Sequence, residues 1–316
     1  MRKLDFEQFK DAVVSGIKEF LPENFEIGEI KVNVVTKNNG VKITGLTILR
    51  KDSMIAPTLY LEPFYSKYED GETMRSILTE IAKMRTENDD FRTFDASLID
   101  AIDNCKNRIL PRLIGVAWNK DLLNERPHII VAEDLAVTFA VELGAHKDGC
   151  MSIPIHNQMA AKWKVTADEL YKIALHNLEE ADCGVVISMR DLLRGNIIAK
   201  LEEEFDCDRE SAEKQFNETL PIDNKMFVVT NKEKTNGACM IMDKKTMQRV
   251  RDLLGSDFYI LPSSIHECIV VPIDDTDADY YRQIVMEVNS SQVALPERLS
   301  DNVYRYTPEA GLIKAD

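Results

Sequence analysis

The stretch Phe258-Tyr-Ile-Leu-Pro-Ser-Ser-Ile-His-Glu-Cys-Ile-Val-Val-Pro272 carries the strongest β-strand signal in the chain. Aromatic and β-branched residues occupy its two ends, and Pro262-Ser263-Ser264 between them is typical of a turn. Segments with helical periodicity lie on both sides of it. We therefore expect two strands joined by a polar turn, with helices packed against them.

The same pattern occurs once before this stretch. Met226-Phe-Val-Val-Thr230 predicts a strand, Asn236-Gly237 a tight turn and Ala238-Cys-Met-Ile-Met242 a second strand, followed by a helix over 244–254. A further helix is expected over 276–288. The region from 226 to 288 therefore predicts a strand–strand–helix unit that occurs twice. Short links favour antiparallel hairpins with helices packed on the sheet, so the predicted fold class is α+β.

The rest of the chain predicts alternating helices and hairpins. An amphipathic helix is expected over 6–20, because apolar residues recur there at steps of three and four. The other expected elements are a hairpin over 30–49, a strand over 58–63, helices over 72–86 and 95–110, strands over 113–118, 134–143 and 150–155, and helices over 166–178, 197–205 and 208–216. The stretch 182–221 has the weakest pattern. We predict segments at 1–112, 113–221 and 222–316, forming one or two compact domains.

Charge and cysteine content restrict the function. With 39 basic and 54 acidic residues the net charge is −15, which disfavours direct binding to nucleic acid. It permits an acidic surface that docks on a protein partner with a basic surface, although simple solubility explains the charge equally directly. The six cysteines include no C-x-x-C pair, and no apolar run is long enough to span a membrane. We expect a cytoplasmic protein without a membrane partner.

The polar residues of the opening stretch are the first candidate binding site: Ser263, Ser264, His266 and Glu267. A zinc-protease helix would need a second histidine where Val270 stands. If the strand continued through the turn, Ser264 and His266 would share one face and Glu267 the other. This alternation argues against a Ser–His–Glu triad and favours a hydrogen-bonded or ligand-facing histidine. Catalysis by His266 with Ser264 remains an alternative.

The C-terminal string Val303-Tyr-Arg-Tyr306 is the second candidate. It predicts a terminal strand that pairs with the sheet. Alternatively, Tyr304, Arg305 and Tyr306 form a recognition surface, since Tyr and Arg are favoured at binding hot spots.

Familiar cofactor and metal motifs are absent from the sequence. The acidic strings at 206–210 and 275–279 lack the glycine and the final glutamate of a calcium loop. No glycine-rich phosphate loop occurs, and the histidines and cysteines lack zinc-ligand spacing. We therefore expect neither a cofactor nor a metal.

Several strings resemble a family of uncharacterised bacterial proteins, catalogued as a domain of unknown function in anaerobic gut bacteria. They are the residues 58–65, 163–177, 236–238, 259–267 and 299–306. The string Pro-Ser-Ser-Ile-His-Glu at 262–267 is the most recognisable of them. The resemblance implies a class and a habitat, and it implies no catalytic residues.

The sequence favours a soluble, non-enzymatic binding or regulatory module. One alternative is an enzyme of unfamiliar type that uses His266 and Ser264. The other is an acidic inhibitor of a nucleic-acid-handling enzyme, suggested by the net charge of −15.

Overall fold

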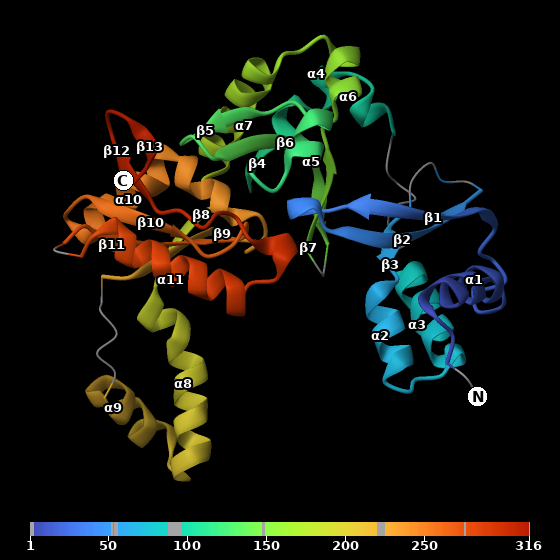
Figure 1. The fold of residues 1–316 in the computed structure, drawn as a ribbon, viewed down its shortest axis with the longest axis horizontal. Coiled ribbons are helices and arrows are strands. Elements are labelled where there is room, and N and C mark those ends of the chain that lie inside the picture. The colour runs from blue at the N-terminus through green and yellow to red at the C-terminus, as the bar shows by residue number, and fades with distance from the viewer. Residues whose placement is uncertain are drawn as a thin grey trace. The chain divides into compact units, whose positions relative to one another are not determined.

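The computed structural model describes residues 3–51, 53, 56–87, 96–146, 149–219, 225–274 and 276–315. The chain divides into two compact units, Met1–Asn104 and Cys105–Asp316. Figure 1 follows the first unit from blue to cyan and the second from green to red. No described helix combines the length and the apolar character needed to cross a membrane.

The first unit holds a three-stranded antiparallel sheet in the order β1-β2-β3. Its elements are α1 (Phe6–Gly16), η1 (Ile17–Glu19), β1 (Ile27–Thr36), η2 (Asn38–Gly40), β2 (Lys42–Arg50), β3 (Thr58–Tyr60), α2 (Glu62–Glu69), α3 (Met74–Glu87), η4 (Ala96–Ile99) and α4 (Ile102–Cys105), whose last residue begins the second unit.

The helix predicted over 6–20 is confirmed as α1 followed directly by η1. Asp5 and Gln8 form a capping box at the start of α1, and the fully buried side chains of Phe9 and Val13 face the core. Between β1 and β2 the chain reverses at Asn39 and Gly40, which both have positive φ. The hydrophobic core of the first unit forms where Phe9 and Val13 of α1 pack with buried side chains of β2 and α3.

The second unit holds two further antiparallel sheets. Its elements are η5 (Lys106–Arg108), β4 (Ile109–Gly115), α5 (Lys120–Glu125), β5 (Ile129–Val131), β6 (Leu135–His146), β7 (Gly149–Pro154), α6 (Asn157–Trp163), α7 (Ala167–Ala181), β8 (Gly184–Ser188), α8 (Met189–Phe205), α9 (Arg209–Thr219), β9 (Phe227–Asn231), η6 (Gly237–Met242), α10 (Lys244–Leu254), β10 (Phe258–Pro262), β11 (Cys268–Pro272), α11 (Ala278–Ser291), η7 (Leu295–Glu297), β12 (Tyr304–Thr307) and β13 (Gly311–Lys314).

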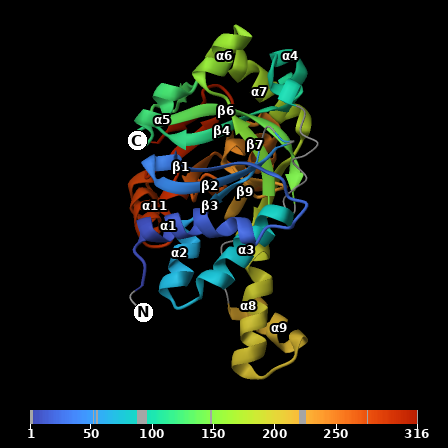
Figure 2. The same ribbon diagram turned by 90° about the vertical axis from the view of Figure 1, so that its right-hand side faces the viewer.

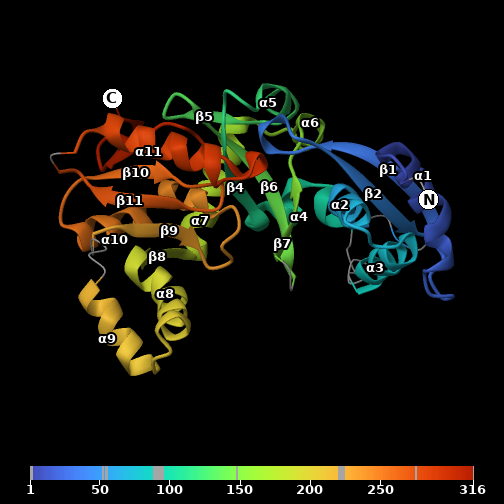
Figure 3. The same cartoon turned by 60° about the horizontal axis from the view of Figure 1, so that its bottom comes forward.

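The smaller sheet has the order β4-β6-β5 with β7 paired to β6, and the larger has the order β13-β12-β10-β11-β9-β8. Figure 3 shows α11 lying along β10 and β11, where Val285 packs with Leu261 and Val271. The 3-10 helix η6 contacts both β9 of the larger sheet and β4 of the smaller. The antiparallel sheets and packed helices confirm the α+β class.

In the first predicted strand–strand–helix repeat, the first strand (as β9) and the helix (as α10) are present, and the second strand is wrong. Residues 237–242 form η6 and not a strand, while β9 pairs with β8 and β11. Five consecutive residues of η6 are buried. A short, continuous apolar run does not distinguish a buried strand from a buried helix, so the sequence pattern misled. The second predicted strand–strand–helix repeat is present, as β10, β11 and α11.

The predicted helix over 95–110 is also wrong. Position 95 lies outside the described residues, and the region that follows contains the short elements η4, α4 and η5 before β4 begins at Ile109. Pro111 does not end a helix. It lies within β4, opposite Phe139, and β4 is an edge strand where a missing N–H costs little.

The stretch 182–221 is more ordered than its sequence pattern indicates. It contains β8 and the 17-residue helix α8, which begins at Met189 rather than near 197 because Ser188 caps it. Position 221 lies outside the described residues. Figure 2 shows α8 and α9 packed together as a helical hairpin. The predicted domain boundaries at 112/113 and 221/222 stay predictions, because they state which segments would fold independently.

Candidate functional site

The polar string Ser263–Glu267 is the connection between β10 and β11. The ladder closes at the pair Pro262 and Cys268, so the five residues between them leave the sheet. The N–H of Ser264 donates to the carbonyl of Glu267 at 3.0 Å, and the N–H of His266 donates to Ser264 Oγ at 3.0 Å. The polar turn expected between the two strands is therefore present, and strand alternation does not continue through Ser264 and His266.

The ring of His266 is held by the loop that follows β9. The N–H of Asn236 donates to His266 Nδ1 at 3.1 Å, and the carbonyl of His266 accepts the Thr230 hydroxyl at 2.8 Å. On the other side of the ring, Nε2 lies 3.9 Å from Glu297 Oε1. Ser264 Oγ accepts a backbone N–H instead of contacting the ring, so a Ser264–His266 catalytic pair has no supporting contact here.

Gly237 allows this close approach. A Cβ at position 237 would lie 2.3 Å from Thr230 Oγ1, 2.6 Å from the Asn231 nitrogen and 2.7 Å from the His266 carbonyl oxygen. Two of these neighbours are backbone atoms, which cannot move aside cheaply. The turn noted in the sequence at Asn236-Gly237 is therefore needed to join β9, η6 and the 263–267 turn.

The three residues of the C-terminal candidate have different environments. Tyr304 is fully buried, and its hydroxyl lies within 2.9 Å of both Asp134 carboxylate oxygens and 2.6 Å from Ser300 Oγ. Burial raises the pKa of Tyr304 well above its ordinary value. Tyr306 stacks on Phe258 at a centroid distance of 6.2 Å, and Arg305 is exposed. The string pairs with the sheet, as predicted, and Tyr304 is not available as a recognition residue.

A cavity of about 250 Å³ lies in the second unit beside η6, and we call it the junction cavity. Residues of both sheets, or of the loop and helix next to them, line it: Leu110, Arg112, Glu142, Leu178, Ala181, Cys183, Asn231, Lys232, Glu233, Thr235 and Cys239. Ligand sites occur preferentially at such junctions between packed layers. None of the residues predicted as site residues lines it.

Arg112 is the distinctive group of the junction cavity. Its guanidinium makes one long hydrogen bond, from Nη1 to the carbonyl of Pro111 at 3.4 Å. In the part of the chain that the structure describes, no carboxylate lies within ion-pair distance of it, although Glu142 and Glu233 line the same cavity. A half-buried arginine usually has a carboxylate partner, because its charge is costly to bury alone.

The two cysteines in the cavity are protonated at neutral pH. Burial raises the pKa of Cys239 to about 12, despite the nearby charge of Arg112. Burial also raises the pKa of Cys183, and the Glu233 carboxylate adds to the shift. Since the thiolate is the reactive form, these residues lack the chemistry of a nucleophile.

One wall of the cavity is the segment 231–236, which we call the cavity loop. The side chain of Asn231 closes it: Nδ2 donates to the carbonyl of Thr235 at 2.9 Å, and Oδ1 accepts the Thr235 N–H at 3.1 Å. Lys234 and Asn236 have φ values of 52° and 53°, in the left-handed region that non-glycine residues rarely adopt. The loop is therefore held in a specific shape by side-chain hydrogen bonds.

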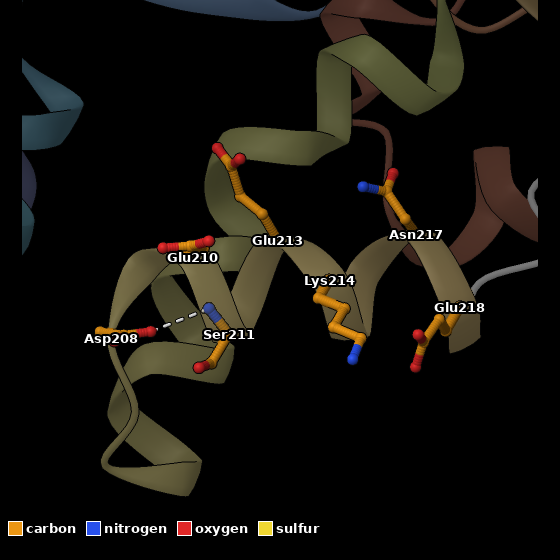
Figure 4. Close-up of a pocket in the computed structure, with 7 residues that line it drawn as sticks. All are labelled: Asp208, Glu210, Ser211, Glu213, Lys214, Asn217 and Glu218. Carbon is orange, nitrogen blue, oxygen red and sulfur yellow. Dashed lines mark hydrogen bonds between the residues drawn. The ribbon is translucent and has the colours of Figure 1, made fainter.

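A second concave surface lies on α9 and is acidic. It encloses about 550 Å³ between Asp208, Glu210, Ser211, Glu213, Lys214, Asn217 and Glu218. Figure 4 shows the carboxylates along the helix, with Asp208 accepting the N–H of Ser211 at 2.9 Å. Glu213 pairs with Arg194 and Arg209, whereas Glu210 and Glu218 have no ion pair among the described residues.

A metal centre has no support in the described ranges. No group of three or more histidine, cysteine, aspartate or glutamate side chains there is arranged to hold an ion. The site residues that the sequence missed are those of the junction cavity. Only a tertiary contact brings Arg112, Cys183 and the cavity loop together, so no spacing in the sequence marks them.

Comparison with known proteins places the chain in one family. Neither the curated proteins nor the solved structures include a match to it. The family of unknown function DUF5688 matches residues 6–308, which is nearly the entire chain and includes both units. The chain therefore belongs to the DUF5688 family of unknown function.

Proposed function

We propose that this protein is a non-enzymatic binding module that holds a small carboxylate-bearing molecule in the junction cavity. The observation that carries the proposal is Arg112, a cavity-lining guanidinium without a carboxylate partner among the described residues. Arginine presents a planar array of donors that matches a carboxylate in a bidentate fashion. A ligand carboxylate would supply the partner that the described part of the chain does not.

The size and chemistry of the cavity fit this ligand class. A volume of about 250 Å³ corresponds to about eight water molecules, which suits a small metabolite rather than a nucleotide. Leu110, Leu178 and Ala181 provide an apolar surface for the body of such a ligand. The protonated thiols of Cys183 and Cys239 favour binding over nucleophilic catalysis.

The test is a titration of the full-length protein with succinate, glutamate and benzoate, using the corresponding amides as neutral controls. We expect at least one carboxylate to bind by calorimetry and its amide to bind more weakly. Arg112→Met keeps an unbranched apolar stem and removes the charged guanidinium, and it should weaken binding roughly tenfold to a hundredfold. The matched control is Arg108→Met, which removes an exposed arginine from η5 and should leave binding unchanged.

Two results would contradict the proposal. One is that none of the carboxylates binds to the wild-type protein. The other is that Arg112→Met and Arg108→Met bind the probe equally well.

A second candidate function is docking of a protein partner with a basic surface on α9. The acidic hollow, in which Glu210 and Glu218 lack ion pairs among the described residues, favours it. An acidic inhibitor of a nucleic-acid-handling enzyme would be one form of this function. An octalysine peptide should bind at low salt and weaken steeply at high salt. The double variant Glu210→Gln, Glu218→Gln should reduce binding, whereas Glu180→Gln on α7 should not; equal binding by all three proteins would exclude the hollow.

Catalysis by His266 with Ser264 stays an alternative, and the hydrogen bonds of the 263–267 turn give it no support. A screen of hydrolase and transferase substrates with His266→Gln as the control would test it. Activity present in the wild type and absent in a folded His266→Gln protein would favour it.

The proposed setting is the cytoplasm of an anaerobic gut bacterium, with neither nucleic acid nor a membrane as a direct partner. The sequence resemblance supports the habitat, and the free thiols of the five described cysteines support a reducing compartment. Immunodetection in cell fractions of a host strain tests this expectation, and recovery of the protein from the culture medium would contradict it.

A further inference from the structure

We infer that His266 is a positioning residue for the junction cavity: its neutral ring holds the cavity loop in place, so acidification loosens this wall. The consequence for ligand affinity rests on the proposed function. The effect on the loop itself does not, since it follows from hydrogen bonds that are present without a ligand.

His266 contacts the chain at both ends of the cavity loop. Its carbonyl accepts the hydroxyl of Thr230, the residue directly before the loop. Its Nδ1 accepts the N–H of Asn236, the last residue of the loop, at 3.1 Å. Only an unprotonated Nδ1 accepts a hydrogen bond, because both ring nitrogens of a histidinium are donors. The second contact is therefore lost when the ring takes up a proton.

The backbone of Asn236 links this contact to the cavity. Its N–H donates to His266 Nδ1, and its carbonyl accepts the thiol of Cys239, whose side chain lines the cavity, at 3.1 Å. Thr235, directly before it, also lines the cavity. Displacement of residue Asn236 therefore moves two parts of the lining at once.

The loop adopts a shape that it would not keep without such contacts. Lys234 and Asn236 occupy the left-handed region of backbone conformation, and side chains with a Cβ are disfavoured there. Disfavoured conformations persist only where the surrounding contacts impose them. Of those contacts, the bonds from the Asn231 side chain lie within the loop, whereas those of His266 connect it to the neighbouring turn.

Charged neighbours of the His266 ring come from its own turn, through Glu267, and from η7, through Glu297. Glu297 of η7 lies 3.9 Å from Nε2 and stabilises a charged ring after protonation. Ile265, in the same turn, donates its N–H to the carbonyl of Glu297, which keeps this carboxylate beside the ring. Burial raises the pKa of Cys239 to about 12, and burial, with smaller contributions from Cys239 and Glu267, raises the pKa of Cys268, so both thiols stay protonated.

The test is amide hydrogen exchange of the full-length protein from about pH 8 to about pH 5, the interval in which histidines take up a proton. Exchange rates are corrected for the intrinsic effect of pH. We expect the protection of the Asn236 amide in the wild type to fall roughly fivefold or more, the value of one ordinary hydrogen bond. Protection of the β1 and β2 amides in the first unit should stay constant and serves as the folding control.

Two variants separate positioning from a general effect on folding. His266→Asn places an amide oxygen near the position of Nδ1 and cannot be protonated, so Asn236 should stay protected at both ends of the pH range. His266→Phe keeps a ring without an acceptor, and protection should be low at both ends. Protection that does not change with pH in the wild type, or that falls equally in His266→Asn, would overturn the inference.

The two proposals fail in different ways. If no carboxylate probe binds, the proposed function fails while the exchange of Asn236 still decides the role of His266. If the succinate or glutamate affinity is lost in Arg112→Met and is independent of pH in the wild type, the cavity stands and the positioning role is wrong. Acid-sensitive binding in the wild type that becomes insensitive in His266→Asn supports both.

Discussion

Tyr304 shows how one residue can have a role opposite to the one its chemistry indicates. Tyrosine beside arginine at the end of a chain is typical of a recognition surface. Here the Tyr304 ring is fully buried, and its hydroxyl meets Asp134 and Ser300. Asp134 also accepts hydrogen bonds from the side chains of Ser300 and Asn302. One carboxylate therefore connects the turn between β5 and β6 to the C-terminal segment. Buried polar networks of this kind stabilise a fold only while every member is paired.

The raised pKa of Tyr304 predicts a loss of stability in alkali. Because burial raises the pKa of Tyr304, the folded state keeps a proton that a tyrosine of the unfolded chain releases near about pH 10. The Tyr304 contribution to the free energy of unfolding is therefore complete below about pH 10 and is lost as the pH rises further. Tyr304→Phe should lower the free energy of unfolding at neutral pH by about 1–2 kcal/mol and flatten the alkaline loss.

Urea unfolding between about pH 8 and about pH 11 measures both effects. Tyr280→Phe is the matched control, since Tyr280 is 56% exposed on α11 and should have little effect. If the free energy of unfolding fell with pH equally steeply in the wild type and in Tyr304→Phe, the alkaline loss would not come from Tyr304.

At the scale of elements, the helices expected over 6–20 and 166–178 are present, whereas a short apolar run misled. In the structure, capping boxes at Asp5 and Thr166 begin α1 and α7. The apolar run 238–242 became the 3-10 helix η6 because its partners are β9 on one side and β4 on the other. Those neighbours are distant in sequence, so no local pattern encodes them.

For two glycines of the second unit, Gly195 and Gly237, we expect substitution by alanine to have opposite effects on stability. Gly195 lies within α8, and the Cβ that an alanine would add there has no atom within 4 Å, so Gly195→Ala should stabilise the protein by about 0.5–1 kcal/mol. Gly237→Ala should destabilise it by about 1–3 kcal/mol or more, because its Cβ meets backbone atoms of Asn231 and His266. Thermal unfolding of both variants checks the signs; stabilisation by Gly237→Ala would refute the close approach.

At the scale of the whole molecule, the chain divides at Asn104 and Cys105 into two units with separate sheets. Multi-domain proteins commonly depart from two-state unfolding. Each unit contains its own buried core residues, such as Leu46 in the first and Ile260 in the second, both fully buried. The acidic total of −15 concerns solubility and partner choice rather than this division.

This division predicts two separable transitions in calorimetry. Leu46→Ala and Ile260→Ala should each cost about 2–5 kcal/mol through the cavity that they leave. Each should lower the melting temperature of one transition and leave the other in place. A single transition that both substitutions shift together would show that the units unfold as one.

The sequence by itself determined the α+β class, the first helix and hairpin, and the β10–β11 pair, because the hydrophobic period and the capping and turn residues that specify these elements are local. It also pointed to the string around His266 as a place of interest. Only the tertiary structure decided that His266 holds the cavity loop, and that Arg112 faces a cavity without a carboxylate partner among the described residues. These contacts join parts far apart in the chain, such as Asn236 with His266 and β4 with η6, and their geometry depends on how the two sheets of the second unit pack around η6.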